Sequence, residues 1–321
     1  MRIASLLVAS FFAVVAGGPA FAQPYPSKPI RLILPFPPGS PSDMVGRTIG
    51  QKLASQVGQN VVVDNRPGAG GTLGLSVAAK SPADGYNILV TSPTIAISPL
   101  LYANLPFDPL RDFVPVARLA TIENVMVVHP SVPVRTLKEF IALARAHPGK
   151  LNYGSGGAGT TNHLANELIQ SLQKIRMTHV AYKGATLAAG ALMSGEVDEV
   201  ILGVAPAMPF IRAGRVRPIV VLSEKRLALL PDVPTGEEAG VPGFKIAIWY
   251  GMFAPAGTPR DVVSRLHAEI AKALQDPELL QRMTNAGMDS WLGTPEDLDR
   301  HLRSEIQRFS HVVKSAGIKA R

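Results

Sequence analysis

Short apolar runs alternate along this chain with longer stretches in which apolar residues recur every three or four positions. The first run, residues 30–35, is bounded by prolines and predicts a buried strand. Ser40 then offers an N-cap, Pro41 suits the first helical turn, and Asp43 follows three residues after the cap. The apolar positions of the next stretch share one helical face: Val45, Ile49, Leu53 and Val57. We therefore predict a strand followed by a helix over residues 41–57.

The same alternation continues through the rest of the sequence. Thr136 and Glu139 form a capping-box pattern at the start of one helix, and Thr258 and Thr294 each precede a proline at the start of two others. We predict strands at 61–64, 88–91, 151–153, 178–181, 199–202 and 217–222, and helices at 72–80, 95–101, 161–173, 185–194 and 206–213, with the last helix ending near 316–317. Such alternation predicts an α/β fold with mostly parallel, doubly wound sheets, whose ligands bind at the carboxyl ends of the strands.

Two extended apolar passages interrupt the alternation. Residues 114–129 and 245–254 are each longer than an average strand. We interpret them as segments that cross between two domains and back. The expected first domain comprises residues 23–122 and 248–321, and the second comprises residues 123–247. Two α/β domains joined by two crossings make a cleft that can close over a ligand by hinge bending.

The first 22 residues have the pattern of a secretory signal peptide. Arg2 precedes an apolar run over residues 3–16, and small residues stand at Ala20 and Ala22. The run is shorter than the roughly 20 residues needed to span a bilayer. We expect cleavage after Ala22 and a product outside the cytoplasm. The chain has no cysteine, which excludes disulfides, thiol catalysis and lipid attachment through an N-terminal cysteine.

The charge pattern favours small anions over nucleic acid. The formal net charge is +8, but lysine and arginine are spread along the chain without a run of five. A modest positive field would help to recruit anionic small molecules. His129, His147, His163 and His179 lack the spacing of metal ligands. We expect no metal, no cofactor and no nucleic-acid partner.

The most informative stretch is residues 151–164, LNYGSGGAGTTNHL, which predicts a strand, a glycine turn and the start of a helix. Glycines at 154, 156, 157 and 159 allow close backbone approach, and Thr160 or Thr161 can cap the helix. A helix N-terminus of this kind can bind a carboxylate or phosphate. A tight turn with no ligand explains the glycines equally well. His163 could contact the anion or act as a base, or pack locally.

A second loop, residues 34–43, is the expected partner of the glycine turn. Its Gly39 and Ser40 could present backbone N–H groups to a carboxylate. Asp43 would repel an anion, so we expect it to cap the helix instead. No GxSxG nucleophile motif is present, because Ser155 stands in the wrong frame.

Many long segments resemble the periplasmic solute-binding proteins of tripartite tricarboxylate transporters, the TctC or Bug family. The segments are YPSKPIRLILPFPPGSPSD, NRPGAGGTLG, ADGYNILV, LPFDPLRDFVPVA, PGKLNYGSGGAGTTNHLA, YKGA, LLPDVPTGEEAGVPGF and WYGMFAPAGTP. The resemblance covers essentially the whole chain after residue 22. It implies a type II periplasmic-binding-protein fold that closes over an organic acid, a periplasmic location and membrane transporter subunits as partners. We expect a monomer.

In that family one ligand carboxylate is held, partly through waters, by the loops that match residues 36–43 and 154–161. The loop matching residues 91–94 and the segment after the strand at 199–202 close the rest of the site. The expected ligand-binding residues are Phe36, Gly39, Ser40, Ser42, Asp43, Ser92, Thr94, Ser155, Gly156, Gly157, Thr160, Thr161, His163, Tyr182, Leu202 and Gly203.

Two positions depart from the family pattern. The first loop commonly reads PGGxxD, whereas here Ser40 and Pro41 follow Gly39. Leu202 and Gly203 stand where many members carry an acidic or amide pair that can meet a ligand ammonium. Their presence argues against an amino acid ligand. We expect a di- or tricarboxylate without an amino group, or an aromatic or otherwise apolar acid.

The leading hypothesis is a carrier without chemistry of its own. One alternative is a sensor that presents its bound form to a membrane receptor, through the same binding chemistry. A second is a secreted hydrolase that uses Ser155 and His163, although no motif places an orienting acid near His163.

Overall fold

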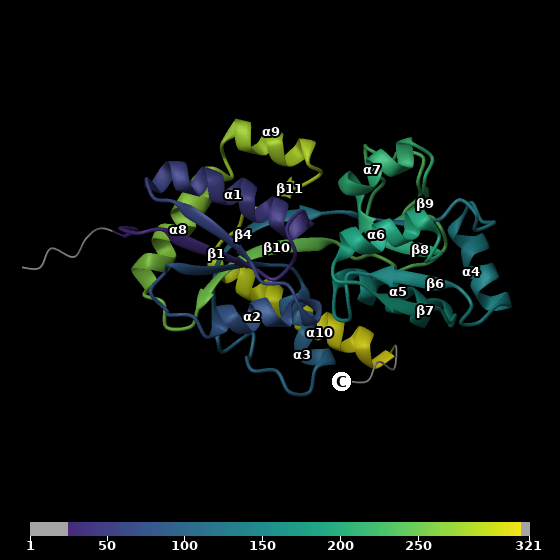
Figure 1. The fold of residues 1–321 in the computed structure, drawn as a ribbon, viewed down its shortest axis with the longest axis horizontal. Helices are drawn as coiled ribbons and strands as arrows, with labels where there is room; N and C mark the ends of the chain where they lie inside the picture. The colour runs from purple at the N-terminus through teal and green to yellow at the C-terminus, as the bar shows by residue number, and fades with distance from the viewer. Residues whose placement is uncertain (1–24, 316–321) are drawn as a thin grey trace, which may run out of the picture.

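Two α/β lobes lie side by side and are joined by long strands (Figure 1). The computed structural model describes residues 25–315. β4 (Phe113–Ile122) and β5 (Asn124–Val128) carry the chain from the first lobe to the second with only Glu123 between them, and β10 (Ile248–Pro255) brings it back. The expected signal peptide and the end of the last helix lie outside the described residues. Within residues 25–315, no helix combines the length and apolarity that a membrane crossing needs.

The first lobe is built on a six-stranded sheet with the order β11-β4-β10-β3-β1-β2. Its other strands are β1 (Ile30–Leu34), β2 (Val61–Asn65), β3 (Asn87–Thr91) and β11 (Asp289–Ser290). One face is covered by α1 (Pro41–Val57), α8 (Arg260–Ala273) and α9 (Pro277–Asn285). The other is covered by α2 (Thr72–Ala79), α3 (Thr94–Leu101) and α10 (Pro295–Ser315), and a short 3-10 turn, η1 (Ala69–Gly71), precedes α2.

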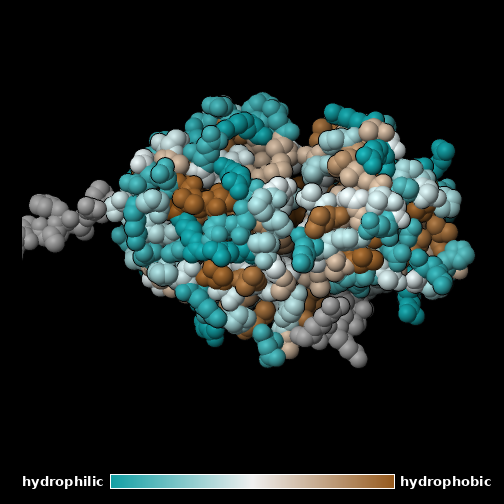
Figure 2. Space-filling view, in the orientation of Figure 1, coloured by the Kyte–Doolittle hydropathy of each residue, from teal (hydrophilic) through white to brown (hydrophobic). Residues whose placement is uncertain are grey.

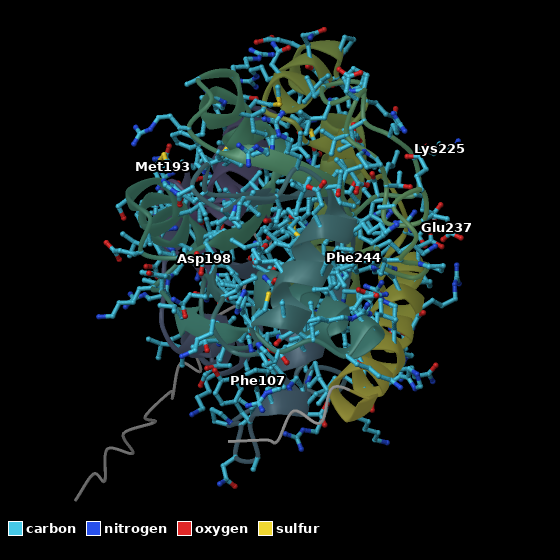
Figure 3. All side chains as sticks on the ribbon, turned by 90° about the vertical axis from the view of Figure 1, so that its right-hand side faces the viewer. Phe107, Met193, Asp198, Lys225, Glu237 and Phe244 are labelled. Carbon is cyan, nitrogen blue, oxygen red and sulfur yellow. The ribbon has the colours of Figure 1, made fainter. Side chains whose placement is uncertain are left out.

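The second lobe has a five-stranded sheet with the order β7-β6-β8-β5-β9. Its strands besides β5 are β6 (Asn152–Ser155), β7 (Thr178–Ala181), β8 (Glu199–Gly203) and β9 (Arg217–Val221). One face packs on α4 (Leu137–Ala146) and α5 (Thr161–Gln173), and the other on α6 (Ala185–Ser194) and α7 (Val204–Arg212). Seen from this end, Lys225 and Glu237 lie at the periphery and Phe244 lies inside (Figure 3).

Both sheets are mixed: each has two parallel pairs, and every antiparallel pair involves a crossing strand, so the sheets are less parallel than the sequence predicts. β1 pairs in parallel with β2 and β3, and β6 pairs in parallel with β7 and β8. β10 runs antiparallel to β3 and β4, and β5 runs antiparallel to β8 and β9, because each enters its sheet from the other lobe. The crossings therefore separate β1, β3, β6 and β8 on one side from β11 and β9 on the other.

One apolar cluster spans both lobes. α10 packs on α3 and β4 of the first lobe and also reaches α5 of the second (Figure 1). Its Phe309 is fully buried in the same cluster as Phe140 of α4 and Leu164 of α5. The space-filling view shows a notch between the lobes near α9 and α7, and apolar residues reach that face only in separate patches (Figure 2). The described fold is thus two sheets held by the crossings and by one long helix.

Most predicted elements are present, and the differences are local. Helix α9 was not predicted, although Asp276 caps it by accepting from Leu279 N–H at 3.0 Å and Pro277 occupies its first position. Strand β11 was not predicted either, because its two residues are too few to show a period. α7 begins at Val204, two residues earlier than predicted, directly after β8. The domain limits at 122/123 and 247/248 stay a prediction.

Candidate functional site

Loops from both lobes line a cavity of about 730 Å³ between them. In the first lobe these loops follow β1 and β2, and in the second they follow β6 and β7. The lining residues are Pro35, Phe36, Pro37, residues 67–71, Tyr102, residues 156–158 and residues 181–184. We call this space the interlobe cleft. It lies on the β1 and β6 side of the crossing strands, at the carboxyl ends of the strands, where the sequence pattern predicts a ligand.

The two lobes touch at the cleft. The Tyr102 hydroxyl of the first lobe lies 3.3 Å from the Ala158 carbonyl oxygen of the second and 3.4 Å from the Ala69 carbonyl oxygen of its own lobe. A Cβ atom at Gly70 would lie only 2.1 Å from the Ala158 oxygen, and Gly70 has a φ of +64°. The contact therefore requires glycine at position 70. The stretch between the predicted strand at 61–64 and the predicted helix at 72–80 was not assigned to the site, although its glycines were an available signal.

Asp43 organises the first predicted loop. Its carboxylate accepts from Gly39 N–H at 3.0 Å, from Arg47 Nε at 2.9 Å and from the Asn65 amide at 3.0 Å. Burial raises the pKa of Asp43, but these hydrogen bonds and the Arg47 charge outweigh it and hold the pKa below its usual value. The Ser40 hydroxyl caps α1 by accepting from Asp43 N–H at 3.3 Å.

The backbone amides of Gly39 and Ser40, which the sequence predicts to contact the ligand, have partners inside their own loop. The Gly39 N–H donates to Asp43, and the Ser40 N–H donates to the Pro37 carbonyl at 3.2 Å. Both amides are thus engaged within the loop, and ligand contact at these two residues stays a prediction. Phe36, by contrast, lines the interlobe cleft.

Three buried hydroxyls of the first lobe lack hydrogen-bond partners among the described residues. They are Ser42 Oγ at the start of α1, Thr91 Oγ1 at the end of β3 and Ser98 Oγ in α3. Ser92 and Thr94 are also buried, and their hydroxyls lie 3.2 Å apart. None of these residues is among those that line the interlobe cleft, so ligand contact at Ser42, Ser92 and Thr94 stays a prediction.

The glycine turn is held by side chains of its own lobe. Gly157 and Gly159 have φ of +119° and +83°. The Ser155 hydroxyl accepts from Gly157 N–H at 3.1 Å, and the Thr160 hydroxyl donates to the Gly157 carbonyl at 2.8 Å. Gly159 N–H donates to His163 Nδ1 at 3.4 Å. Thr160 also caps α5, as predicted, and Thr161 is buried at its first position.

Ser155 pairs with His179, which the sequence brought into consideration only as a metal ligand. The Ser155 Oγ atom lies 2.6 Å from His179 Nε2, and Ser155 is fully buried. The His163 and His179 rings are in contact at a tilt of 35°, with centroids 4.4 Å apart. Ser155 and His163 therefore belong to one group, linked through the half-buried His179, instead of a pair open to the cleft. The role of His179 depends on the pairing of strands β6 and β7, which cannot be read from a single sequence.

The remaining predicted residues are in two environments. Tyr182 lines the cleft with its hydroxyl 3.5 Å from Glu196. Gly156 lines the cleft as well, and a Cβ atom there would lie 3.0 Å from the Ala185 nitrogen. Leu202 is buried in the cluster between β8, α6 and α7, and a Cβ atom at Gly203 would lie 3.0 Å from the Ile122 side chain.

The electrostatics of the cleft suit an anion. Lys183 is the only charged side chain among the described residues that line it. No group of three or more histidine, aspartate or glutamate side chains within residues 25–315 is arranged to hold a metal ion. The cleft thus offers the hydroxyls of Tyr102 and Tyr182, glycine backbone, aromatic edges and one ammonium group.

A comparison with known families decides the classification. The sequence model of a family described as "Tripartite tricarboxylate transporter family receptor", TctC, matches residues 45–318. This chain belongs to the TctC receptor family. The resemblance seen in the sequence is thereby confirmed.

Individual relatives agree with the family assignment. The receptor is 41% identical to the "UPF0065 protein in tcbD-tcbE intergenic region" of Pseudomonas sp. strain P51, over 90% of this chain and 86% of that one. It shares 36% identity and a TM-score of 0.88 with the R. palustris protein Rpa4515, solved with adipate, covering 92% and 100% of the two chains. MatC from Rhodopseudomonas palustris, solved with malate, gives 32% identity and a TM-score of 0.85 over 90% and 100%. The periplasmic-binding-protein fold is confirmed by these structures.

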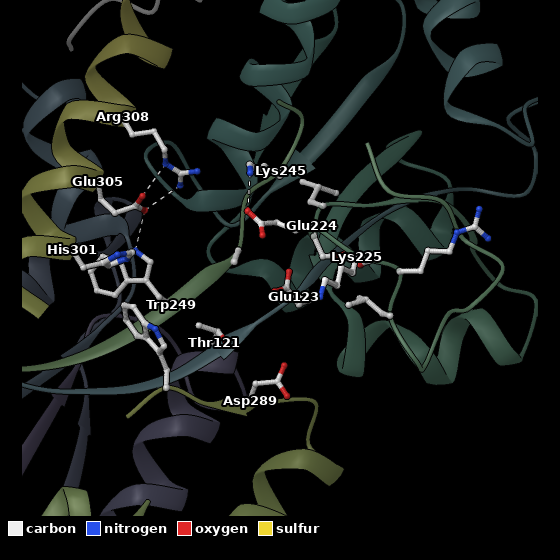
Figure 4. Close-up of a pocket in the computed structure, with 16 residues that line it drawn as sticks. Thr121, Glu123, Glu224, Lys225, Lys245, Trp249, Asp289, His301, Glu305 and Arg308 are labelled. Carbon is white, nitrogen blue, oxygen red and sulfur yellow. Dashed lines mark hydrogen bonds and ion pairs between the residues drawn. The ribbon is translucent and has the colours of Figure 1, made fainter. Parts of the chain in front are cut away.

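The receptor has a second cavity on the opposite side of the crossing strands. This hinge cavity measures about 510 Å³ and is lined by crossing residues, by the loop after β9 and by α10 (Figure 4). Lys245 pairs with Glu224 at 2.8 Å, and Arg308 pairs with Glu305 at 2.8 Å. Burial, with further repulsion from Asp289 and Glu224, raises the pKa of Glu123 to about 7. The sheet orders place β11 and β9 at this side, and the hinge cavity shares no lining residue with the interlobe cleft.

Proposed function

We propose that this receptor captures a small organic carboxylate in the interlobe cleft and presents it to the membrane subunits of a tripartite tricarboxylate-type transporter. The observation that carries the proposal is that the glycine turn before α5 faces the glycine loop at 67–71 across a cleft with a single lining charge, Lys183. Relatives solved with adipate and malate support it. The periplasm is the location that this role requires, after removal of the segment ending near Ala22.

The lining favours a ligand without an ammonium group. No carboxylate side chain is among the described residues that line the cleft, and the nearby Asp43 is neutralised by Arg47. An amino acid would leave its ammonium group without a counter-charge in a partly desolvated space, which is costly. A dicarboxylate can place one carboxylate near the glycine turn that precedes α5 and the other near Lys183. An acid with an apolar body fits the proline and tyrosine lining equally.

Binding proceeds by closure of the lobes. Thr161 and Asn162 stand in the first turn of α5, where backbone N–H groups point out of the helix and its dipole favours negative charge. The loops at 67–71 and 156–158, which approach each other at Gly70 and Ala158, would then cover the ligand. Water is excluded when the loops meet, which strengthens each ionic contact inside.

The environment of Ser155 argues against hydrolysis. Ser155 is fully buried, and its hydroxyl is engaged by His179 and by the backbone of Gly157. We therefore infer a carrier and no enzymatic activity.

A thermal-shift screen tests the proposal. Adipate, malate, citrate, benzoate and glutamate are compared on purified receptor, with adipamide as the uncharged control. A ligand at 100 times its dissociation constant stabilises the folded state by about 2.7 kcal/mol. We expect adipate or malate to raise the melting temperature and adipamide and glutamate to leave it unchanged. A screen in which no carboxylate shifts the transition, or in which glutamate alone does, contradicts the proposal.

A further inference from the structure

His179 of the edge strand β7 lies at the centre of the contacts that shape the glycine turn. We propose that it is a positioning residue for ligand binding: through Ser155 and His163 it fixes the two glycine amides that set the turn between β6 and α5. The role in ligand affinity rests on the proposed function, whereas the role in ordering the turn can be tested without a ligand.

The turn is rich in glycine, so contacts from neighbouring side chains are needed to hold it in one conformation. Gly157 and Gly159 both adopt φ in the left-handed region, and glycine loses more conformational freedom on ordering than any other residue. A turn that was mobile before binding would lower affinity by the entropy needed to order it. Here the amides of both glycines are held by side chains, Gly157 by Ser155 and Gly159 by His163.

Both of these side chains meet at His179. Strand pairing sets Tyr153 directly opposite His179, so that Ser155, two residues further along β6, becomes its diagonal neighbour. The result is the 2.6 Å contact between Ser155 Oγ and His179 Nε2 and a tilted ring contact between His179 and His163, with centroids 4.4 Å apart. The Tyr153 ring stacks on the His179 ring, nearly parallel to it, with ring centroids 4.8 Å apart.

The group is anchored to α5 behind the turn. The Tyr153 hydroxyl lies 2.5 Å from Glu167, which also accepts from Gln170 at 3.0 Å and lies 3.9 Å from His163 Nε2. Buried polar side chains, unlike apolar ones, must each find a hydrogen-bond partner. A network in which they all do so fixes a single geometry. The chain therefore uses a hydrogen-bonded stack, anchored at one end to a helix, at the place where the glycine turn must be held.

Two substitutions separate the hydrogen bond from the ring stack. H179Q retains a polar atom in the position of Nε2 and loses the ring, whereas H179F keeps the ring and loses the bond to Ser155. His129 supplies the matched control, because its Nδ1 atom lies 2.7 Å from Ser131 Oγ in the same lobe, at the end of β5 that pairs with the start of β8 and so lies away from the cleft. H129F removes a comparable histidine–serine contact without touching the turn.

Amide hydrogen exchange of the ligand-free receptor is the deciding measurement. We expect H179F to speed the exchange of the Gly157 amide by about tenfold or more, with H179Q close to wild type and H129F without effect. S155A should match H179F, and the double variant should be no faster, because both changes remove one contact. Unchanged Gly157 exchange in H179F, or a uniform increase across the whole second lobe, overturns the positioning role.

Affinity for adipate or malate, whichever the screen identifies, is the second readout. H179F should weaken binding by about tenfold while H179Q and H129F stay within about threefold. If affinity falls in proportion to the drop in melting temperature in all three variants, the positioning role is contradicted and the role of His179 is merely structural. If wild-type receptor binds no carboxylate, the proposed function fails, and the exchange result still decides whether His179 orders the turn.

Discussion

At the scale of single residues, Glu199 shows how burial sets the pH response. It is fully buried on β8, and neither carboxyl oxygen makes a hydrogen bond of good geometry with the described residues. Burial raises its pKa well above the usual value, with Asn166 opposing and Asp198 adding to the shift. The folded state therefore holds the proton after the unfolded chain has lost it, and stability falls as pH rises above the unfolded pKa.

Replacing Glu199 by glutamine should remove this loss. We expect E199Q to melt about 3 °C or more above wild type at pH 8 and to match it near pH 4, where the carboxyl is neutral in both states. Thermal unfolding at the two pH values checks this. E237Q, at an exposed position of the same lobe, is the control and should melt like wild type at both. An E199Q advantage that is equal at pH 4 and pH 8 would contradict the ionisation argument.

Lys183 is the residue expected to contribute long-range attraction to the cleft. It is exposed, so its contribution is screened by water and salt. K183Q should weaken dicarboxylate binding about threefold at low ionic strength, and the difference should shrink at about 0.5 M salt. K225Q, at the hinge cavity, is the matched control. Calorimetric titration at two salt concentrations measures both, and equal losses in K183Q and K225Q would show a general field effect instead of a local contact.

At the scale of elements, the strands and helices could be predicted well because their periods are local. Helix boundaries at 41–57, 161–173 and 185–194 match the structure, since caps and apolar spacing are read within a few residues. The contacts that shape the site are not local. The Ser155–His179 contact depends on the β6–β7 register, and the approach of Gly70 to Ala158 depends on how two lobes meet. A single sequence contains no period that reports either.

The contact at Gly70 makes the loop at 67–71 a determinant of closure. G70A should bind its ligand about tenfold or more weakly, because a Cβ atom cannot be accommodated beside the Ala158 oxygen when the lobes close. G58A is the matched control: Gly58 has a φ of +67°, and a Cβ atom there would meet nothing within 4 Å, so it carries the backbone cost alone. Calorimetry gives the affinities, and small-angle scattering reports closure on ligand addition. Equal affinity in the two variants would remove this loop from the closing surface.

At the scale of the whole molecule, the crossing strands act as the hinge, and Glu123 is the single residue between β4 and β5. Its carboxyl lies in the hinge cavity, where Asp289 comes from the first lobe and Glu224 from the second. Lys225, Lys245 and Arg308 also line this cavity and temper the repulsion. Because the cavity and the cleft lie on opposite sides of the crossings, we expect a hinge motion that opens one to narrow the other. A charge on Glu123 should therefore lower the stability of the fold. It should also raise the free-energy cost of bringing the Asp289 and Glu224 carboxylates together.

The pKa of Glu123, near 7, gives this hinge a pH window. Between its unfolded value of 4.5 and about 7, the folded state holds the proton and the unfolded chain does not, so stability falls as pH rises and levels off above 7. E123Q should flatten this slope, with a gain at pH 8 on the order of 1–2 kcal/mol after allowance for partial solvent exposure. D289N should move the window to lower pH by removing one repelling charge. Urea unfolding at pH 5, 6, 7 and 8 distinguishes these outcomes, and parallel pH profiles for wild type and E123Q would show that Glu123 ionises as freely in the folded hinge as in the unfolded chain.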